Sequence, residues 1–384
     1  MNPESGKVKA TILLVSSLTI MSMITISASL PDMTKAFSNL PNASGLVKLT
    51  LSFPGLFIAL SAVVAGIFID KFGRLKLLGA SLILYAVSGS SGYWLENIYL
   101  ILAGRAVLGI SVGISMTIVT TLVADYFQGK ARQKFAGIQI AVMSLGGIIF
   151  ITLGGFLADV SWRAPFLLYL FSILILPFTY LFLKEPQKAE EARASNTLVK
   201  SPKIIWFVFI NVMLMWVIFF IIPVQVPFHL KSIGIEKNAL IGIAIASATF
   251  FSAVSAFSYS KLKDKLNFHQ VFGLGYFIMA LGYAIIAMSA SYLIVLAGIL
   301  LVGLGMGFLI PNANIWVMQL APIEIRGREI GRLTTFWFMG QFLSPILLLP
   351  FLQIITLSQM FYVISGILIG LCILFLILNS RLKK

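Results

Sequence analysis

The sequence predicts an all-α membrane protein with twelve transmembrane helices in two parallel six-helix pseudo-repeats, and three observations support that prediction. Of the 384 residues, 59% are hydrophobic and 11% are charged, whereas a soluble domain carries about 25% charged residues. Apolar runs long enough to cross the hydrocarbon core as helices recur from end to end. The second half also repeats residues of the first half at a constant spacing. Because a backbone in lipid must satisfy its own hydrogen bonds, these runs are expected to be helical.

The expected spans are separated by short polar segments. They are residues 10–32, 46–69, 77–94, 98–123, 135–157, 164–183, 204–227, 239–259, 270–289, 292–318, 330–351 and 357–379. The first run resembles a signal peptide because Lys7 and Lys9 precede it, but its apolar stretch is longer than a typical signal core. We therefore count it as a span.

Lys and Arg are distributed unevenly between the two sides of the membrane. With the N-terminus inside, 22 of them fall in cytoplasmic segments and five in segments on the opposite side. The positive-inside rule then predicts a multi-pass protein of the plasma (inner) membrane with both termini in the cytoplasm. The net charge of +15 therefore reports orientation and contact with anionic membrane lipid. We expect no nucleic-acid partner.

The longest polar stretch divides the spans six from six. We expect an N-terminal six-helix bundle over residues 1–183, a cytoplasmic linker over 184–203 and a C-terminal six-helix bundle over 204–384. The matching residues, offset by 194 positions, are Leu102-Ala103-Gly104 with Leu296-Ala297-Gly298, Gly109 with Gly303, Gly113 with Gly307, Arg132 with Arg326, Gly137 with Gly331, Gly79 with Gly273, and Asp70-Lys71 with Asp264-Lys265. Six spans per half make these repeats parallel, as in one large class of secondary transporter.

A short charged turn, GIFIDKFGRLKLL at residues 66–78, joins the second and third spans. It resembles the G-x-x-x-D-[RK]-x-G-[RK] signature that the major facilitator superfamily carries at this place. The residues on the key positions are Gly66, Asp70, Gly73 and Arg74. This resemblance, together with twelve spans, implies a transporter that works by alternating access.

Further stretches are similar to the drug and metabolite exporters of that superfamily, the drug:proton antiporter branch. Arg105 followed by Gly109 resembles its second signature, and SWRAPF at 161–166 resembles its usual turn into span six. Residues 303–314 and 321–331 resemble its span ten and the following loop. One stretch departs from the family: residues 150–155 keep paired glycines but lack the Gly-Pro that antiporters usually carry in span five.

The resemblance implies a charge cluster that controls switching between states. It places Asp70 at the cytoplasmic junction of the two halves, paired with Arg74, and makes Asp125 at the end of span four a third member. Breaking this cluster would accompany inward opening. Gly73 allows the chain to reverse tightly, and Gly66 allows span two to approach a neighbour closely. The alternative is that these residues only anchor topology.

The second copy of this turn, over residues 260–273, lacks two of the key residues. It has Asn267 where the first copy has Gly73, and Phe268 where the first copy has Arg74. We therefore expect the full turn cluster in the N-terminal half alone.

Arg105 is the most informative single residue. It lies eight residues into span four, about 12 Å from the outer membrane edge. An arginine at this depth costs a few kcal/mol and should face a partner or a cavity. Its repeat mate is Ile299, so the fold itself does not require the charge. Arg105 could tune the proton affinity of a nearby acid or contact an anionic substrate, or it could be a structural arginine tied to backbone carbonyls.

Proton coupling also requires a carboxylate that can lose its water. All thirteen acidic residues lie at span ends or in loops, and Asp32 near the outer end of span one is the best placed. Asp32 could communicate with Arg105, or it could be a solvated helix end. His229 and His269 lie near span ends and are poor relay candidates. No metal-ligand spacing and no nucleophile–base pair is present, so we expect no metal, no cofactor and no enzymatic activity.

Polar and tryptophan side chains that interrupt apolar faces are candidates for lining a substrate cavity, although each could equally join helices. They are Gln139, Trp206, Asn211, Trp216, Gln225, Asn312, Asn314 and Trp316. A cavity with few acids and many Phe and Met residues suits a bulky amphipathic molecule, and Arg105 favours a neutral or anionic one.

Three functions fit the sequence. The first is proton-coupled efflux of an amphipathic drug-like compound or metabolite by a monomeric secondary transporter, driven by the proton gradient. The second is uptake or uniport of a small organic anion, which fits the missing Gly-Pro. The third, a lipid-handling or sensor protein, is least favoured.

Overall fold

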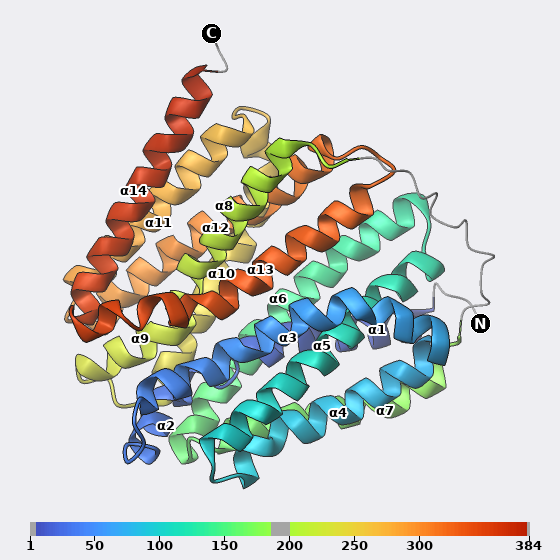
Figure 1. Ribbon diagram of the computed structural model, residues 1–384, viewed down its shortest axis with the longest axis horizontal. Coiled ribbons are helices and arrows are strands. Elements are labelled where there is room, and N and C mark those ends of the chain that lie inside the picture. Colours follow the sequence, from blue (N-terminus) through green and yellow to red (C-terminus); the bar gives the residue numbers. More distant parts are fainter. Residues whose placement is uncertain (1–4, 186–199, 382–384) are drawn as a thin grey trace. The chain divides into compact units, whose positions relative to one another are not determined.

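The computed structural model describes residues 5–185 and 200–381, except for the side chain of Asp70. The described elements are all helical (Figure 1). Twelve helical stretches in this part of the chain are long and apolar enough to cross a membrane, which confirms the predicted spans. The chain divides into two compact units, Met1–Leu198 and Val199–Lys384. Their boundary falls within the expected linker, of which residues 186–199 lie outside the described part.

The N-terminal unit contains six spans, two of which are made of more than one helix. Its elements are α1 (Gly6–Ile24), η1 (Ser27–Ser29), α2 (Leu30–Ala36), α3 (Ala43–Phe72), α4 (Arg74–Trp94), α5 (Ile98–Tyr126), α6 (Gly129–Val160), η2 (Ala164–Leu170) and α7 (Phe171–Phe182). Span one comprises α1 to α2, and span six comprises η2 and α7.

The C-terminal unit also contains six spans. Its elements are α8 (Lys203–Phe219), α9 (Ile221–Ser232), α10 (Asn238–Lys263), α11 (Phe268–Met288), α12 (Tyr292–Leu320), α13 (Arg326–Leu348), η3 (Phe351–Gln353) and α14 (Leu357–Arg381). Span seven comprises α8 and α9, and span eleven comprises α13 and η3.

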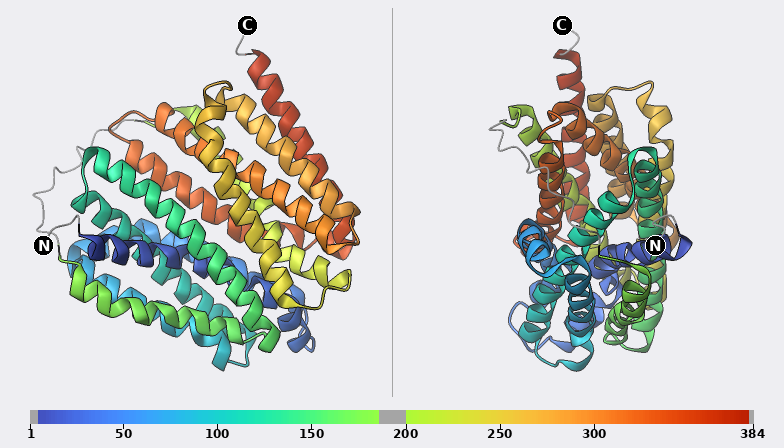
Figure 2. Two further views of the ribbon diagram at one scale, coloured as in Figure 1. Left: turned by 180° about the vertical axis from the view of Figure 1, so that it is seen from behind. Right: turned by 90° about the vertical axis from the view of Figure 1, so that its right-hand side faces the viewer.

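The two units pair their spans in the same way. In the N-terminal unit the main contacts join α3 to α5, α4 to α5, α4 to α7 and α1 to α6. In the C-terminal unit the corresponding contacts join α10 to α12, α11 to α12, α11 to α14 and α8 to α13 (Figure 2). The sequence repeat therefore extends to the neighbours that each span selects, as expected for parallel repeats of one six-helix unit.

Glycines on α5 and α12 explain part of this shared packing. A Cβ atom on Gly109 would lie less than 3.0 Å from the carbonyl oxygen of Pro54, and one on Gly303 would lie equally close to that of Ala248. Pro54 and Ala248 are themselves 194 positions apart. Close helix approach through small residues is the usual way in which membrane helices gain packing energy. The same glycine-mediated contact between two helices therefore occurs once in each unit.

Both first spans break at equivalent positions, which the hydropathy pattern does not reveal. Span one is interrupted around Ile26 between α1 and η1, and span seven is interrupted at Phe220 between α8 and α9. These residues are again 194 positions apart. Each interrupted stretch as a whole is still long and apolar enough to count as one span, so hydropathy alone does not mark the break.

Substitution of Gly109 tests the packing of α5 against α3. We expect Gly109→Val to lower the free energy of unfolding of the N-terminal unit by about 1–3 kcal/mol, because an overpacked contact forces the helices apart. Thermal unfolding of the purified protein measures the effect. Gly137→Val is the matched control, because no described atom lies within 4 Å of a Cβ at Gly137. Equal destabilisation by both variants would contradict the assigned contact.

Candidate functional site

Arg105 lies buried in the N-terminal unit between two aromatic rings. Only 1% of its surface is exposed. Its guanidinium carbon lies 4.6 Å from the ring centre of Phe166 and 4.7 Å from that of Tyr169, both on η2. A guanidinium on desolvated aromatic faces gains about 2 kcal/mol from cation–π attraction. We call Arg105, Phe166 and Tyr169 the arginine site.

The sequence around the site makes room for these two rings. Gly89 and Gly92 on α4 face Tyr169 and Phe166, because a Cβ on either glycine would overlap the ring opposite it. The turn before η2 is held by Arg163, whose Nη1 donates to the carbonyl oxygen of Leu95 at 2.6 Å and also contacts those of Gly92 and Tyr93. The SWRAPF segment therefore positions span six against the end of α4.

Two nitrogen atoms of Arg105 have no hydrogen-bond partner in the described part of the chain. Nη1 and Nη2 are buried and have no hydrogen-bond partner among the described residues, and the hydroxyl of Tyr169 is in the same situation. A buried charged group without hydrogen bonds is costly. The repeat mate, Ile299, is fully buried and apolar, so the fold is compatible with an uncharged residue here. The arrangement can bind a carboxylate through the two free nitrogens.

Asp32, the predicted coupling acid, lies at the start of α2. Its Oδ1 is 3.4 Å from Nζ of Lys35, one turn further along, and about a quarter of its side chain is exposed. Communication between Asp32 and Arg105 stays a prediction.

The predicted turn cluster contains an ion pair between α4 and α5. Nε of Arg74 lies 2.8 Å from Oδ2 of Asp125. Gly73, between α3 and α4, has φ +82° and ψ 163°, a conformation that is essentially restricted to glycine. The side chain of Asp70, the predicted partner of Arg74, lies outside the described residues.

Glu185 is a member of this cluster that sequence reasoning does not identify. Its two carboxylate oxygens accept hydrogen bonds from the backbone N–H groups of Arg74 and Leu75, at 2.7 and 2.8 Å. The carboxylate thus satisfies the first donors of α4 and interacts favourably with the helix dipole. It also fastens the segment after span six to the turn, together with hydrogen bonds between Tyr126 and the backbone of Lys184. The only signal in the sequence is an acid directly after the span.

Gly66 has a different environment from the one expected. No described atom lies within 4 Å of a Cβ at Gly66. A close helix contact inside the N-terminal unit therefore does not explain this glycine.

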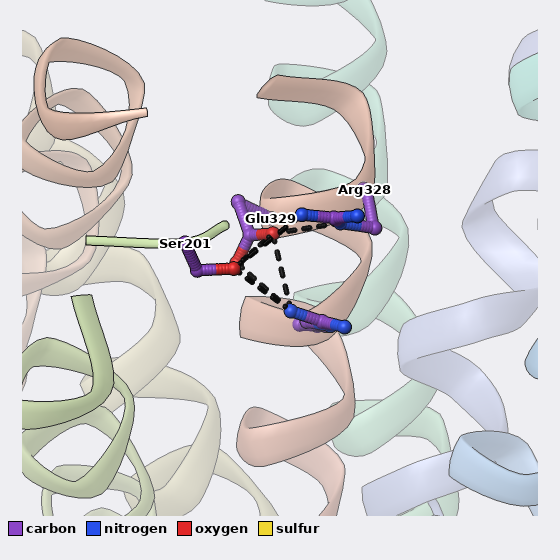
Figure 3. A network of polar contacts seen from close by, with 4 residues as sticks. Ser201, Arg328 and Glu329 are labelled. Carbon is purple, nitrogen blue, oxygen red and sulfur yellow. Dashed lines mark hydrogen bonds and ion pairs between the residues drawn. The ribbon is translucent and has the colours of Figure 1, made fainter. Parts of the chain in front are cut away.

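The C-terminal unit has a charge cluster of its own, at a different place from the repeated turn. Figure 3 shows the fully buried carboxylate of Glu329 on α13 beside Ser201 and Arg328. Oε1 of Glu329 accepts from Ser201 Oγ at 2.9 Å, from Arg328 Nε at 2.9 Å and from Arg332 Nη1 at 3.2 Å. This cluster fastens the segment before α8 to span eleven. The repeat mate of Glu329 is Phe135, so the cluster belongs to the second half alone.

Loss of the Glu329 carboxylate should destabilise the C-terminal unit. We expect Glu329→Ala to lower its free energy of unfolding by about 1–3 kcal/mol, because Ser201 and two partly exposed arginines lose the carboxylate that accepts their hydrogen bonds. Thermal unfolding of the purified protein tests this result. Glu324→Ala, at an exposed position in the preceding loop, should have no comparable effect. Unchanged stability of Glu329→Ala would show that the arginines are already solvated.

Four of the predicted cavity residues use their amides to hold helices. Gln139 donates to Ser16, and Asn211 accepts from the hydroxyl of Tyr276. Asn312 accepts from Tyr259 and donates to the backbone of Phe268. Asn314 donates within its own helix, to the carbonyl oxygen of Ile310. These contacts are of the kind that joins or stabilises membrane helices.

The other predicted cavity residues have three kinds of surroundings. Trp316 stacks on Phe268 in an aromatic cluster, and Trp206 is 45% exposed. Gln225 is fully buried, and neither amide atom has a partner among the described residues. Trp216 has a buried indole nitrogen, also without a partner in the described part, and its ring lies 5.7 Å from that of Trp337. No group of three His, Cys, Asp or Glu residues in the described part could hold a metal ion.

The chain is similar to bacterial efflux proteins over most of its length. It is 25% identical over 313 residues to the multi-drug resistance efflux pump PmrA of Streptococcus pneumoniae, which covers 77% of this chain and 78% of PmrA. It is 26% identical over 322 residues to the quinolone resistance protein NorA of Staphylococcus aureus, and the alignment covers 78% of this chain and 80% of NorA. It is 25% identical over 361 residues to the bacillibactin exporter of Bacillus subtilis, and the alignment covers 87% of this chain and 88% of the exporter.

Solved structures with the same fold are transporters of more distant sequence. A D-xylose-proton symporter aligns with a TM-score of 0.78 at 16% identity over 96% of each chain. A POT family transporter aligns with a TM-score of 0.79 at 14% identity, over 98% of this chain and 97% of the other. At these identities the likeness shows the fold alone. The sequence profile of the Major Facilitator Superfamily matches residues 12–267 and 234–384. The chain therefore belongs to the Major Facilitator Superfamily and is a secondary transporter of small molecules, not an enzyme.

Proposed function

We propose that this transporter exports an amphipathic drug-like compound or metabolite against the entry of protons, by alternating access. The named relatives support the direction, since PmrA is described as an efflux pump and the bacillibactin protein as an exporter. The proposed substrate is neutral or anionic, and the proposed monomer requires no cofactor besides the proton gradient.

The arginine site is the observation that carries this proposal. A fully buried guanidinium with two unpartnered nitrogens offers charge-assisted hydrogen bonds to an anionic group. It can hold the carboxylate of a substrate, or it can stabilise the ionised form of an acid that releases its proton. Asp32 is the proposed acid, because no other acidic residue is better placed along the first and fourth spans.

The charge cluster at the turn is proposed to control the change of state. Arg74, Asp125 and Glu185 connect three places in the chain: the start of span three, the end of span four and the end of span six. Such a network must break or rearrange when helices move relative to one another. Asp70 and Gly66 are proposed to act at the same turn.

The proposed orientation follows from the distribution of charge. With both termini in the cytoplasm of a cell bounded by the plasma (inner) membrane, 22 Lys and Arg residues lie inside and five outside. The turn cluster then lies on the cytoplasmic side, where linker residues 184–203 connect the two bundles.

A second candidate is uptake or uniport of a small organic anion. It is favoured by the absence of Gly-Pro in residues 150–155, together with the positive charge of the arginine site. In that case Arg105 would bind substrate without any exchange of protons.

Counterflow in proteoliposomes tests the proposed function. Purified protein is reconstituted with unlabelled compound inside, and entry of labelled compound is measured for a panel of neutral, anionic and cationic amphipathic molecules. We expect counterflow of neutral or anionic members. Counterflow restricted to small hydrophilic anions would favour the second candidate, and counterflow of cations alone would contradict the assigned role of Arg105.

A further inference from the structure

Two tryptophans and a glutamine lie together where span seven packs against span eleven. The rings of Trp216 on α8 and Trp337 on α13 have centres 5.7 Å apart and planes inclined by 33°. Gln341 lies one turn beyond Trp337 on the same helix and is 1% exposed. Gly340 permits this approach, because a Cβ there would lie 2.9 Å from Cβ of Trp216.

These three side chains share one property: each has a buried N–H donor without a partner. Nε1 of Trp216, Nε1 of Trp337 and Nε2 of Gln341 have no hydrogen-bond partner among the described residues. In the interior of a protein, most buried polar groups are hydrogen-bonded, and an unsatisfied one is costly. Three such donors at one contact between α8 and α13 can donate to the oxygen atoms of a ligand.

The repeat shows that the fold does not require these residues. Their mates in the N-terminal unit are Ser22, Met143 and Gly147, at the corresponding contact between α1 and α6. The glycine that permits the close approach is kept in both units, as Gly146 and Gly340. Both units therefore have a glycine at this helix contact, whereas the two tryptophans and the glutamine occur at these positions in the C-terminal unit alone.

We propose that Trp216, Trp337 and Gln341 form a ligand subsite for flat aromatic compounds that carry a carbonyl or carboxylate oxygen. Indole rings supply large contact surfaces for an aromatic ligand, and the three N–H groups supply donors to its oxygen atoms. This inference rests on the proposed function, because it names the class of compound that the transporter recognises.

The donor pattern makes the subsite selective. A ligand with oxygen acceptors satisfies the unpaired N–H groups, whereas a ligand without acceptors leaves them unsatisfied, and sites of this kind discriminate strongly. An aromatic cation without oxygen could contact only the ring faces. The subsite should therefore prefer neutral or anionic aromatic compounds.

Equilibrium dialysis of the full-length protein in nanodiscs tests the subsite. The probes are 1-hydroxy-2-naphthoate, which is flat and carries acceptors, and tetraphenylphosphonium, which is aromatic and has none. We expect Trp216→Phe, Trp337→Phe and Gln341→Leu each to raise the Kd of the naphthoate about tenfold, the worth of one buried hydrogen bond. The Kd of tetraphenylphosphonium should stay within about threefold of the wild-type value.

Phenylalanine keeps a six-membered aromatic ring in place and removes the N–H donor together with the rest of the five-membered ring. These variants should fold, which their Tm verifies, and tetraphenylphosphonium reports the effect of the lost ring surface. Trp94→Phe is the matched control, because Trp94 is 68% exposed at the end of α4 and should change neither Kd. Wild-type affinity for the naphthoate in both tryptophan variants would overturn the proposal. Equal loss of both probes would also overturn it, because the rings and not the donors would then carry binding.

The outcome separates the subsite from the proposed function. If the wild-type protein does not bind the naphthoate but catalyses counterflow of other compounds, the subsite is wrong and the transporter assignment stands. If it binds the naphthoate but catalyses no counterflow with any compound, the proposed function fails while the subsite is retained.

Discussion

Arg105→Met should strongly reduce transport without destabilising the protein. Transport should fall about 100-fold, because a charge-assisted hydrogen bond to the buried guanidinium contributes up to about 3 kcal/mol. The Tm should change little, because removal of the desolvation penalty of a buried charge offsets the loss of about 2 kcal/mol of cation–π attraction to Phe166 and Tyr169. Counterflow in proteoliposomes and thermal unfolding of the same preparation measure both quantities.

Arg163→Met is the matched control for this prediction. Arg163 lies next to the same site, but its guanidinium donates to backbone carbonyls at the end of α4. Its loss should lower the Tm, because these carbonyl oxygens lose their donor. If Arg105→Met lowered the Tm as much as Arg163→Met does, Arg105 would be a structural arginine, and the arginine site would have no functional role.

Gly73→Val should impair switching between states and leave substrate binding intact. At φ +82° and ψ 163°, a residue with a β-branched side chain is strained by about 1–3 kcal/mol. The turn would relax, and the N–H groups of Arg74 and Leu75 would move away from Glu185. We expect transport to fall about tenfold, while the Kd of a bound compound changes by less than about twofold. Counterflow and equilibrium dialysis measure the two quantities.

Gly129→Val separates loss of the turn cluster from general backbone strain. Gly129 at the start of α6 also has a positive φ, +53°, but no described atom lies within 4 Å of a Cβ there. This variant should transport at close to the wild-type rate. Loss of binding by Gly73→Val to the same degree as loss of transport would mean that the turn does not act as a switch.

Hydropathy and the repeat were sufficient to predict the twelve spans, because each apolar run has the length that a bilayer demands. The family resemblance also placed Arg74 and Asp125 in one charge cluster, although the partner it predicted for Arg74 was Asp70. The breaks at Ile26 and Phe220 were not predicted, because each stretch as a whole is apolar enough to count as one span. The nearest sequence signals are Pro31 and Pro223, which lie in the first turn of the helix after each break. Only the structure shows that the two breaks are separated by the same 194 positions as the sequence repeat.

Glu185, Trp337 and Gln341 were not identified from the sequence, and the reason is the same for all three. Glu185 contacts a turn 110 residues away in sequence, and nothing near it in the chain indicates a helix end to cap. Trp337 and Gln341 read as ordinary members of an apolar span, because the sequence does not show which polar atoms find partners. Arg105 was identified from the sequence because a charge inside a span is costly wherever it points. Sequence rules therefore identify a residue whose burial is costly in any surroundings. They miss residues whose role depends on contacts with residues distant in the sequence.

Flux driven by an imposed pH gradient tests proton-coupled export through the arginine site most directly. Proteoliposomes are loaded with a compound that the wild-type protein exchanges in counterflow, and its movement is followed with and without a gradient, for wild type and Arg105→Met. We predict that the gradient drives uphill movement of the compound opposite to the protons in the wild type, and no movement in the variant. Flux that does not respond to the gradient for any exchanged compound would contradict the account.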